Sequence, residues 1–237
     1  MRTLAVISRK GGVGKTTLSV NLAVSAWRAG LKTVLADLDA QRSAALWGRI
    51  RAEAGPAVVA TTVGKLFPMW CAAENSGCDL MVLDTPAGDH EDMLPAIRLA
   101  DLCVLVCRPN AFDVDALRHS IDLVRQLDKP SLVVLNQAPS RRQGSEQESV
   151  CTAAADLRAT GVRLAEIGLR YRVAFPASAA RGLSVGELDV TSPAAREIAG
   201  VWGQVWSMLG EGRGPARPGC LPAGPAIVRE LGLTLGV

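Results

Sequence analysis

The chain has 237 residues, 49% of them hydrophobic, and carries a net charge of +3. This length and composition suffice for one sizeable domain with its own hydrophobic core. A charge this close to neutral excludes a strongly basic nucleic-acid binder, so any contact with nucleic acid must come from a local patch. The sequence contains no apolar run near the ~20 residues that a membrane helix needs. No signal peptide fits before the first strand, so we expect a cytoplasmic protein.

Six cysteines form neither a C-x-x-C motif nor a cluster with metal-ligand spacing. A domain of this size does not require disulfides for stability. Cys103 and Cys107 lie four positions apart within one apolar run, which places them on the same face of a strand. We therefore predict that these two cysteines are core thiols.

Short apolar runs rich in β-branched residues are typical of strands buried on both faces. They cover residues 3–8, 33–37, 79–84, 102–107 and 131–136. Stretches with helical patterning lie between them, at residues 17–29, 44–54, 92–100 and 114–127. This alternation predicts an α/β fold, a doubly wound, mostly parallel sheet flanked by helices, with ligands at the carboxyl ends of the strands.

The pattern weakens after Asn136. We expect an exposed loop, a helix near 150–159, a short strand at 163–168, another loop and a final helix at 193–209. Residues 211–237 are rich in Gly and Pro and predict an extension without packed regular structure, after a domain at 1–210. An amphipathic membrane-binding helix would be expected to carry several cations and large aromatic residues, whereas the last residues, 226–237, contain a single Arg229 and no aromatic residue.

The stretch SRKGGVGKTT, residues 8–17, follows a predicted strand and precedes a predicted helix. Glycines in such a loop let backbone N–H groups turn toward phosphates, while Lys15 reaches the outer phosphates and Thr16 offers a hydroxyl to Mg2+. The sequence therefore predicts a nucleotide-binding loop. Its binding residues are Gly11, Gly12, Val13, Gly14, Lys15, Thr16 and Thr17.

Three aspartates lie at or just after the ends of predicted strands, near this loop. Asp37 and Asp39 follow the second strand, and Asp84 ends the third. Phosphoryl transfer depends on positioning, so a carboxylate here can support magnesium or orient the attacking water. We assign Asp39 to the water, and Asp37 and Asp84 to the magnesium shell. The segment after Asp84 suits a loop that moves with the γ-phosphate.

The sequence KGGVGKTT from Lys10 resembles the deviant Walker A motif of the ParA/MinD group of P-loop ATPases, which does not require the glycine that Arg9 replaces. The D-x-D-x-Q segment from Asp37 and the strand ending at Asp84 are further similarities. A weaker similarity lies in residues 175–195, before the final helix. One departure is Ala40, where the group usually has proline.

The resemblance implies an ATP- and Mg2+-dependent homodimer that sandwiches two nucleotides. Lys10 would reach the phosphates of the partner subunit, while Lys15 would serve the nucleotide of its own subunit. Asp39 matches the hydrolytic aspartate. Asn136 matches a position that recognises adenine, and Pro176 lies where the group lines the base pocket.

Among members of the group, the chain looks most like a short DNA-partitioning ATPase, associated with the nucleoid. Such a protein binds nonspecific DNA and is stimulated by a ParB-like or other cargo-adaptor protein. Arginine suits contacts with phosphate, and the candidates for DNA are Arg141, Arg142, Arg170, Arg172 and Arg181. The alternative is a MinD-like or metabolic P-loop ATPase that does not act on DNA.

Overall fold

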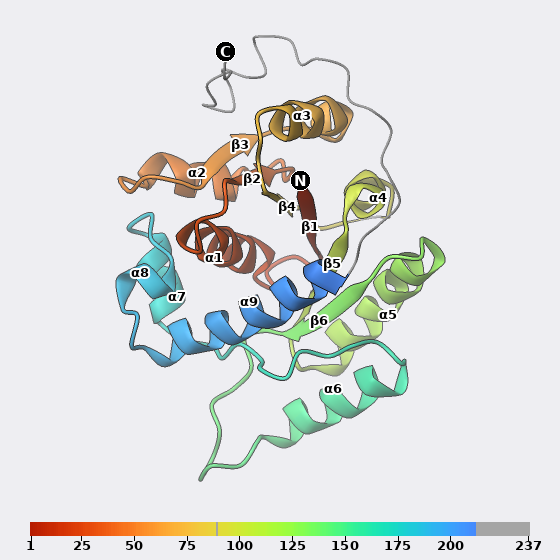
Figure 1. Ribbon diagram of the computed structural model, residues 1–237. Coiled ribbons are helices and arrows are strands. Elements are labelled where there is room, and N and C mark those ends of the chain that lie inside the picture. Colours follow the sequence, from red (N-terminus) through yellow and green to blue (C-terminus); the bar gives the residue numbers. More distant parts are fainter. Residues whose placement is uncertain (89, 212–237) are drawn as a thin grey trace.

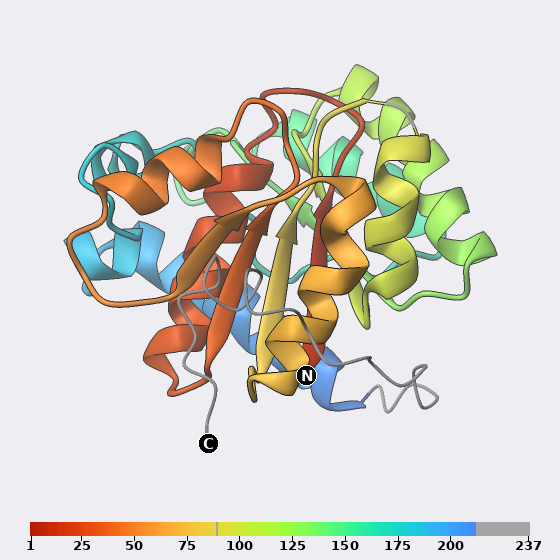
Figure 2. The same ribbon diagram turned by 90° about the horizontal axis from the view of Figure 1, so that it is seen from above.

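The computed structural model describes residues 1–88 and 90–211, so the predicted extension lies outside the described residues from position 212 onward. The described residues form an α/β structure with a sheet of six parallel strands between two layers of helices (Figures 1 and 2). This confirms the predicted fold class. No helix in these residues is long and apolar enough to cross a bilayer.

The strands are ordered β3-β2-β4-β1-β5-β6 across the sheet. Their bounds are β1 Arg2–Ile7, β2 Thr33–Asp37, β3 Ala57–Ala60, β4 Leu80–Asp84, β5 Leu102–Cys107 and β6 Ser131–Leu135. Because every pairing is parallel, the carboxyl ends of the strands share one edge of the sheet.

Helices α1 to α5 fill the crossover connections between successive strands, and α6 to α9 follow the last strand. The first six are α1 Lys15–Arg28, α2 Ser43–Ile50, α3 Val63–Asn75, α4 His90–Leu99, α5 Ala111–Gln126 and α6 Glu148–Ala159. The last three are α7 Ala174–Ala179, α8 Val185–Leu188 and α9 Pro193–Glu211.

Alternate residues of the strands enter two separate cores, as the pleat of a strand requires. In β1, Ala5 and Ile7 pack with α3, α4, α5 and α6, whereas Leu4 and Val6 pack with α1, α2 and α9. Cys103 and Cys107 are both buried on the first of these faces, which confirms the prediction for them.

Some elements differ from the prediction. The sequence patterning predicted neither β3 nor α3, and α7 and α8 lie where a loop was expected. The expected strand at 163–168 is wrong. This segment runs beside β6 but makes only isolated bridges, from Leu164 to Val133 and from Arg170 to Ala138. The chain bends between them, at Glu166 and Ile167, and the next residue, Gly168, packs so closely that an added Cβ would lie 3.1 Å from the carbonyl oxygen of Leu135.

Candidate nucleotide-binding site

The loop between β1 and α1 has the backbone geometry of a phosphate cradle. Gly12 and Gly14 have φ values of 71° and 92°, in the left-handed region that glycine adopts most readily. A Cβ at position 14 would also lie 2.2 Å from Nδ2 of Asn136. Helix α1 begins next, with no side-chain cap and no acidic residue in its first turn. Its N–H groups and its dipole therefore favour an anion.

The two lysines of the loop occupy different environments. Lys15 is buried, and its Nζ donates to the main-chain oxygen of Lys10 at 3.3 Å. Burial lowers the pKa of Lys15, and the negative charges of Asp84 and Asp39 oppose that shift. Lys10 is exposed. Lys15 is therefore held inside the loop, whereas the side chain of Lys10 lies at the surface.

Asp37 and Asp84 face each other across neighbouring strands, because the parallel register of β2 and β4 pairs these two residues. Both are fully buried. The carboxylate of Asp37 accepts the N–H of Asp39 at 3.1 Å and the N–H of Ala45 at 2.9 Å. Burial nevertheless raises the pKa of Asp37. In the structure, the Asp37 carboxylate holds the Asp39 segment and the first turn of α2. That Asp37 also belongs to the magnesium shell stays a prediction.

Asp84 fits a hydrated divalent cation better. Its Oδ1 accepts the hydroxyl of Ser19 at 3.0 Å, while Oδ2 is buried and has no hydrogen-bond partner in the described structure. An orphaned buried carboxylate oxygen is costly unless something charged or polar meets it. Residues 1–88 and 90–211 contain no group of three or more His, Cys, Asp or Glu that could cage a metal. The arrangement suits Mg2+ held by phosphates, by Thr16 and through water by Asp84.

Asp39 lies at the turn that follows β2. It is half-buried, and its Oδ1 accepts the N–H of Gln41 at 2.9 Å. Arg42, which the sequence analysis missed, has a φ of 55° and donates to the main-chain oxygens of Asp37 at 2.8 Å and Thr61 at 2.6 Å. These bonds fix the turn although Ala40 replaces the usual proline.

Asn136 and Gln137 clasp the phosphate loop from the end of β6. Nδ2 of Asn136 donates to the carbonyl of Val13 at 2.7 Å, and Nε2 of Gln137 donates to the carbonyl of Gly12 at 2.8 Å. The Oδ1 of Asn136 accepts the N–H of Gln137, whose φ is 53°. Asn136 therefore positions the phosphate loop, which the sequence did not predict. Its contact with adenine stays a prediction. Pro176 is exposed on α7, and its contact with the base stays a prediction.

The segment after Asp84 is tied to the same loop. The hydroxyl of Thr85 donates to the carbonyl of Val6 at 2.8 Å, and the N–H of Gly88 donates to the carbonyl of Arg9 at 3.2 Å. A movement of either segment therefore has to break or re-form a bond to the other.

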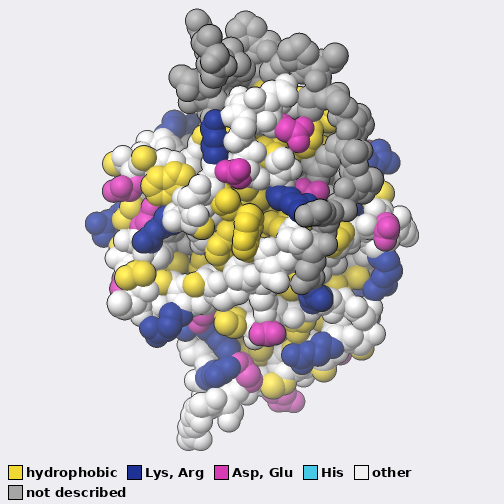
Figure 3. All heavy atoms as spheres, viewed as in Figure 1, with side chains coloured by type: hydrophobic (Ala, Val, Ile, Leu, Met, Phe, Trp, Pro, Cys, Tyr) yellow, Lys and Arg dark blue, Asp and Glu magenta, His cyan; other side chains and the backbone are white. Residues whose placement is uncertain are grey.

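The arginines predicted to bind DNA fall into two groups. Arg170 pairs with both carboxylate oxygens of Glu146, and Arg172 pairs with Glu197 with Nε to Oε1 at 3.1 Å. The Arg170 pair, with help from Arg141, lowers the pKa of Glu146 to about 2. Arg142 and Arg181 are exposed and have no carboxylate partner among the described residues. On the face shown in Figure 3, Lys and Arg side chains are scattered among acidic ones.

We expect Asp84→Asn to stabilise the nucleotide-free protein at pH 8. Burial raises the pKa of Asp84 from 3.8 to about 7, so its ionised form destabilises the fold. This cost is complete above pH 7 and fades as the pH falls from 7 toward 4. The free energy of unfolding should rise by about 1–3 kcal/mol at pH 8 and by less near pH 4.

Urea unfolding of both proteins in a chelator, at the two pH values, measures this effect. Asp115→Asn, an exposed residue of α5, is the matched control. Asp84→Asn should also remove the dependence of ATP affinity on Mg2+. If Asp84→Asn is less stable than the parent at pH 8, the ionised Asp84 carboxylate does not destabilise the fold.

The sequence matches the family model described as the CobQ/CobB/MinD/ParA nucleotide binding domain over residues 4–185. Maintenance of carboxysome distribution protein A of Gloeobacter kilaueensis is 34% identical over 190 residues, 78% of this chain and 83% of that protein. The chromosome-partitioning ATPase Soj of Thermus thermophilus is 46% identical over 55 residues, 23% of this chain and 22% of Soj.

Among solved structures, the MinC:MinD cell division protein complex of Aquifex aeolicus is similar in fold. The TM-score is 0.70 at 21% identity, and the match covers 92% of this chain and 99% of that one. The family model spans well over half of the sequence, and its first matched residues lead into the phosphate loop. The chain belongs to the CobQ/CobB/MinD/ParA family of nucleotide-binding domains.

Proposed function

We propose that this chain is an ATP-dependent dimerising switch that binds nonspecific DNA and positions a cargo. The observation that carries the proposal is the division between the two lysines of one loop, with Lys15 buried at the site and Lys10 exposed. An exposed lysine beside the phosphate cradle is free to meet the nucleotide of a second subunit. The names of two relatives, a carboxysome-distribution protein and a chromosome-partitioning ATPase, support a cargo-positioning task.

Different residues of the site serve different parts of ATP hydrolysis: binding the phosphates, holding the metal ion, orienting the attacking water and contacting the base. The N–H groups of the loop and Lys15 bind the phosphates, and Thr16 and Asp84 would hold a hydrated Mg2+. The cation supplies charge stabilisation for the phosphoryl group. Asp39 accepts a hydrogen bond from the attacking water and aims it at the γ-phosphate. Asn136 and Pro176 contact the adenine.

Hydrolysis should be slow in the isolated protein, because the phosphate site is complete only in the dimer. Turnover is therefore measured with ATP alone, with duplex DNA, and with a candidate adaptor protein. Stimulation by DNA and adaptor together supports the switch. Turnover that depends on a small-molecule substrate and ignores DNA would favour a metabolic enzyme, and dimerisation without any DNA binding would favour a MinD-like protein.

We expect Asp39→Ala to trap the ATP-bound dimer on DNA. The substitution removes the group that orients water, and Lys15 and the loop backbone remain. ATP turnover should fall by about 100-fold or more, while ATP binding persists. Single-turnover hydrolysis and the lifetime of the DNA complex measure the two effects. Asp92→Ala, an exposed acid of α4, is the control. Normal turnover by Asp39→Ala would remove this residue from the mechanism.

The exposed arginines should contribute more to DNA binding than the paired ones. Arg142→Ala and Arg181→Ala are each expected to weaken binding equally on all sequences and to lower the salt slope by roughly one unit. Arg170→Ala and Arg172→Ala should lower it by less, because each guanidinium is already neutralised by a glutamate.

Binding is measured by fluorescence anisotropy over a range of salt concentrations. Arg118→Ala, an exposed residue of α5, makes the same change in net charge. An equal loss in Arg118→Ala would mean that only the total charge matters. An unchanged slope in Arg142→Ala and Arg181→Ala would exclude both residues.

A further inference from the structure

A hollow of about 370 Å³ lies between α1, α8 and α9, away from the phosphate loop. Its lining residues come from three separate parts of the chain. They include Asn21 and Arg28 of α1, Gly186 and Val190 in and just after α8, and Arg196 and Trp202 of α9. Nothing described so far for the nucleotide site uses this hollow.

Among residues 1–88 and 90–211, Arg28 and Arg196 are the charged ones that line the hollow. Nη1 of Arg28 donates to the carbonyl of Gly186 at 3.1 Å, and Nη1 of Arg196 donates to the carbonyl of Thr191 at 2.5 Å. In the part of the chain that the structure describes, neither forms an ion pair with a carboxylate. The nearby Asp189 is bound to the N–H and hydroxyl of Thr191, and the charge of Arg196 adds to these bonds in lowering the pKa of Asp189. The rim therefore carries two arginines, and the exposed Asp189 offsets only the charge of Arg196 in part.

The rest of the lining is mainly apolar. Val24 and Ile198 are buried in the core beneath it, while Val190 is 66% exposed and Trp202 is half-buried at its side. An occupant that only carried negative charge would leave this surface unused. A nucleic-acid backbone or an anionic membrane would meet the rim but would not enter the hollow. An acidic segment with a bulky apolar side chain would satisfy both features.

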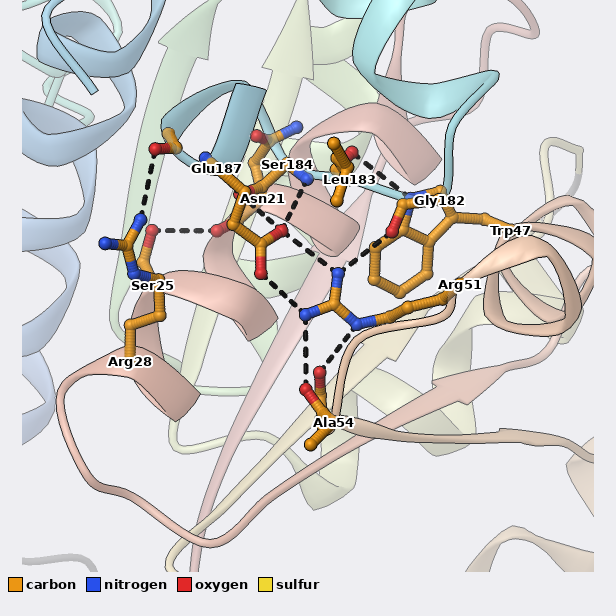
Figure 4. Close-up of polar contacts among 12 residues, drawn as sticks. Asn21, Ser25, Arg28, Trp47, Arg51, Ala54, Gly182, Leu183, Ser184 and Glu187 are labelled. Atoms are coloured by element: carbon orange, nitrogen blue, oxygen red, sulfur yellow. Dashed lines mark hydrogen bonds and ion pairs between the residues drawn. The ribbon is translucent and has the colours of Figure 1, made fainter. Parts of the chain in front are cut away.

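The wall formed by α8 is held rigidly in place. Arg51, whose side chain is 3% exposed, forms an ion pair with Glu187 at 2.6 Å and donates to the carbonyl of Gly182 (Figure 4). Its guanidinium lies 5.8 Å and 5.0 Å from the ring centres of Trp27 and Trp47. Glu187 in turn completes a capping box with Ser184 at the start of α8. A preformed wall lowers the entropy that an occupant must lose on binding.

Two connections join this wall to the nucleotide site. Asn21 of α1 accepts the N–H of Val185 at 2.9 Å and donates to the carbonyl of Thr17, in the first turn after the phosphate loop. The first turn of helix α2 is bonded to the Asp37 carboxylate through the N–H of Ala45, and the helix ends at Ile50, directly before Arg51. A shift of either segment on ATP binding would therefore reach the hollow.

We propose that the hollow docks an acidic segment of a partner protein, anchored by one bulky apolar side chain, and that this docking is coupled to the bound nucleotide. The proposal rests on the ATP-dependent switch proposed above, because it gives the partner of that switch a place to bind. Coupling of this kind is reciprocal: if ATP changes the affinity for the segment, the segment changes the affinity for ATP by the same factor.

The probe is a short fluorescein-labelled peptide in which leucine and phenylalanine alternate with glutamate, tested on the full chain by anisotropy. We expect saturable binding that is about tenfold weaker in the double variant Arg28→Ala, Arg196→Ala. Ala199→Trp, which fills the hollow without changing its charge, should weaken binding at least as much. Arg49→Ala and Gly203→Trp are matched controls in exposed positions outside the lining, and should stay within about twofold.

Coupling is read from the peptide affinity with and without Mg·ATP, and from the ATP affinity with and without peptide. The factor by which ATP changes the peptide affinity should equal the factor by which the peptide changes the ATP affinity. Arg51→Met should bring both factors toward one, because it loosens the wall that connects the two sites. Equal binding of a polyglutamate peptide would overturn the apolar anchor. Duplex DNA and anionic vesicles are tested as competing occupants of the hollow. If either displaces the peptide, and its own binding is lost in the Arg28→Ala, Arg196→Ala double variant and in Ala199→Trp, the hollow belongs to that class of partner. No binding, or no effect of ATP, would overturn the proposal.

These outcomes are separate from a failure of the proposed function. If ATP drives dimerisation but the peptide does not bind, only the docking site is refuted. If the peptide binds as described but ATP never drives dimerisation, the switch is refuted and the hollow stands as a binding site.

Discussion

Lys15→Met is expected to abolish ATP binding while the protein stays folded. The side chain is buried beside Asp84 and is the cation that the loop directs inward. Methionine keeps most of its length but cannot donate to phosphate. Charge-assisted hydrogen bonds are worth about 1.5–3 kcal/mol each, so the loss of the contacts made by Lys15 should weaken ATP binding by about 100-fold or more. Isothermal titration with Mg·ATP measures this.

Thermal unfolding of Lys15→Met shows whether the fold survives. Burial of this ammonium is unfavourable in the free protein, which is why its pKa is lowered, so we expect little loss of stability. Lys65→Ala, an exposed residue of α3, is the control for a lost positive charge. ATP affinity within about threefold of the parent would remove Lys15 from the phosphate site.

Lys10→Ala is expected to leave ATP binding nearly intact and to abolish dimerisation driven by ATP. The side chain is exposed, and its described contact with the site is through its main-chain oxygen, which accepts Nζ of Lys15. Alanine retains that oxygen, so the substitution removes only the outer cation. Affinity for ATP should stay within about threefold, whereas the ATP-bound dimer should weaken by at least about 100-fold.

Light scattering after size-exclusion chromatography in Mg·ATP distinguishes monomer from dimer. Arg9→Ala changes the neighbouring cation and serves as the control, and it should still dimerise. A Lys10→Ala protein that dimerises normally would refute the role across the interface. One that loses ATP binding would place Lys10 in its own subunit's site.

The sequence was enough to predict most of the sheet, because strands buried on both faces read as continuous apolar runs. Strand β3 was missed, since Ala57–Ala60 is short, edge-located and only partly buried. Helix α3 was missed because Pro68 interrupts its pattern. The wrong strand at 163–168 shows the reverse case. This stretch has strand-like residues, but the chain bends at Glu166 and Ile167 and a continuous ladder with β6 does not form.

The chemistry of the candidate site was predictable where it depends on order along the chain. The loop, its two lysines and the aspartates at strand ends follow from local sequence. The pairing of Asp37 with Asp84 does not, since it depends on β2 and β4 being neighbours in the sheet. The clasp by Asn136 and Gln137 is equally non-local, because it joins the end of β6 to a loop more than 120 residues earlier.

The arginines show the same limit on the surface. A run such as GLRYRVAF predicts clustered cations, but their partners come from distant segments. Arg170 meets Glu146, 24 residues earlier, and Arg172 meets Glu197, 25 residues later. Net charge and local composition cannot reveal such pairing, which decides how much charge is left for DNA.

We expect ATP, and not ADP, to join two copies of this chain through Lys10. This is measured by sedimentation velocity of the unmodified protein in Mg·ATP, in Mg·ADP and without nucleotide, with Asp39→Ala included to slow hydrolysis. The protein should be monomeric without nucleotide and in ADP, and it should form dimers in ATP that live longest in Asp39→Ala. The same monomer–dimer distribution in all three conditions would contradict it.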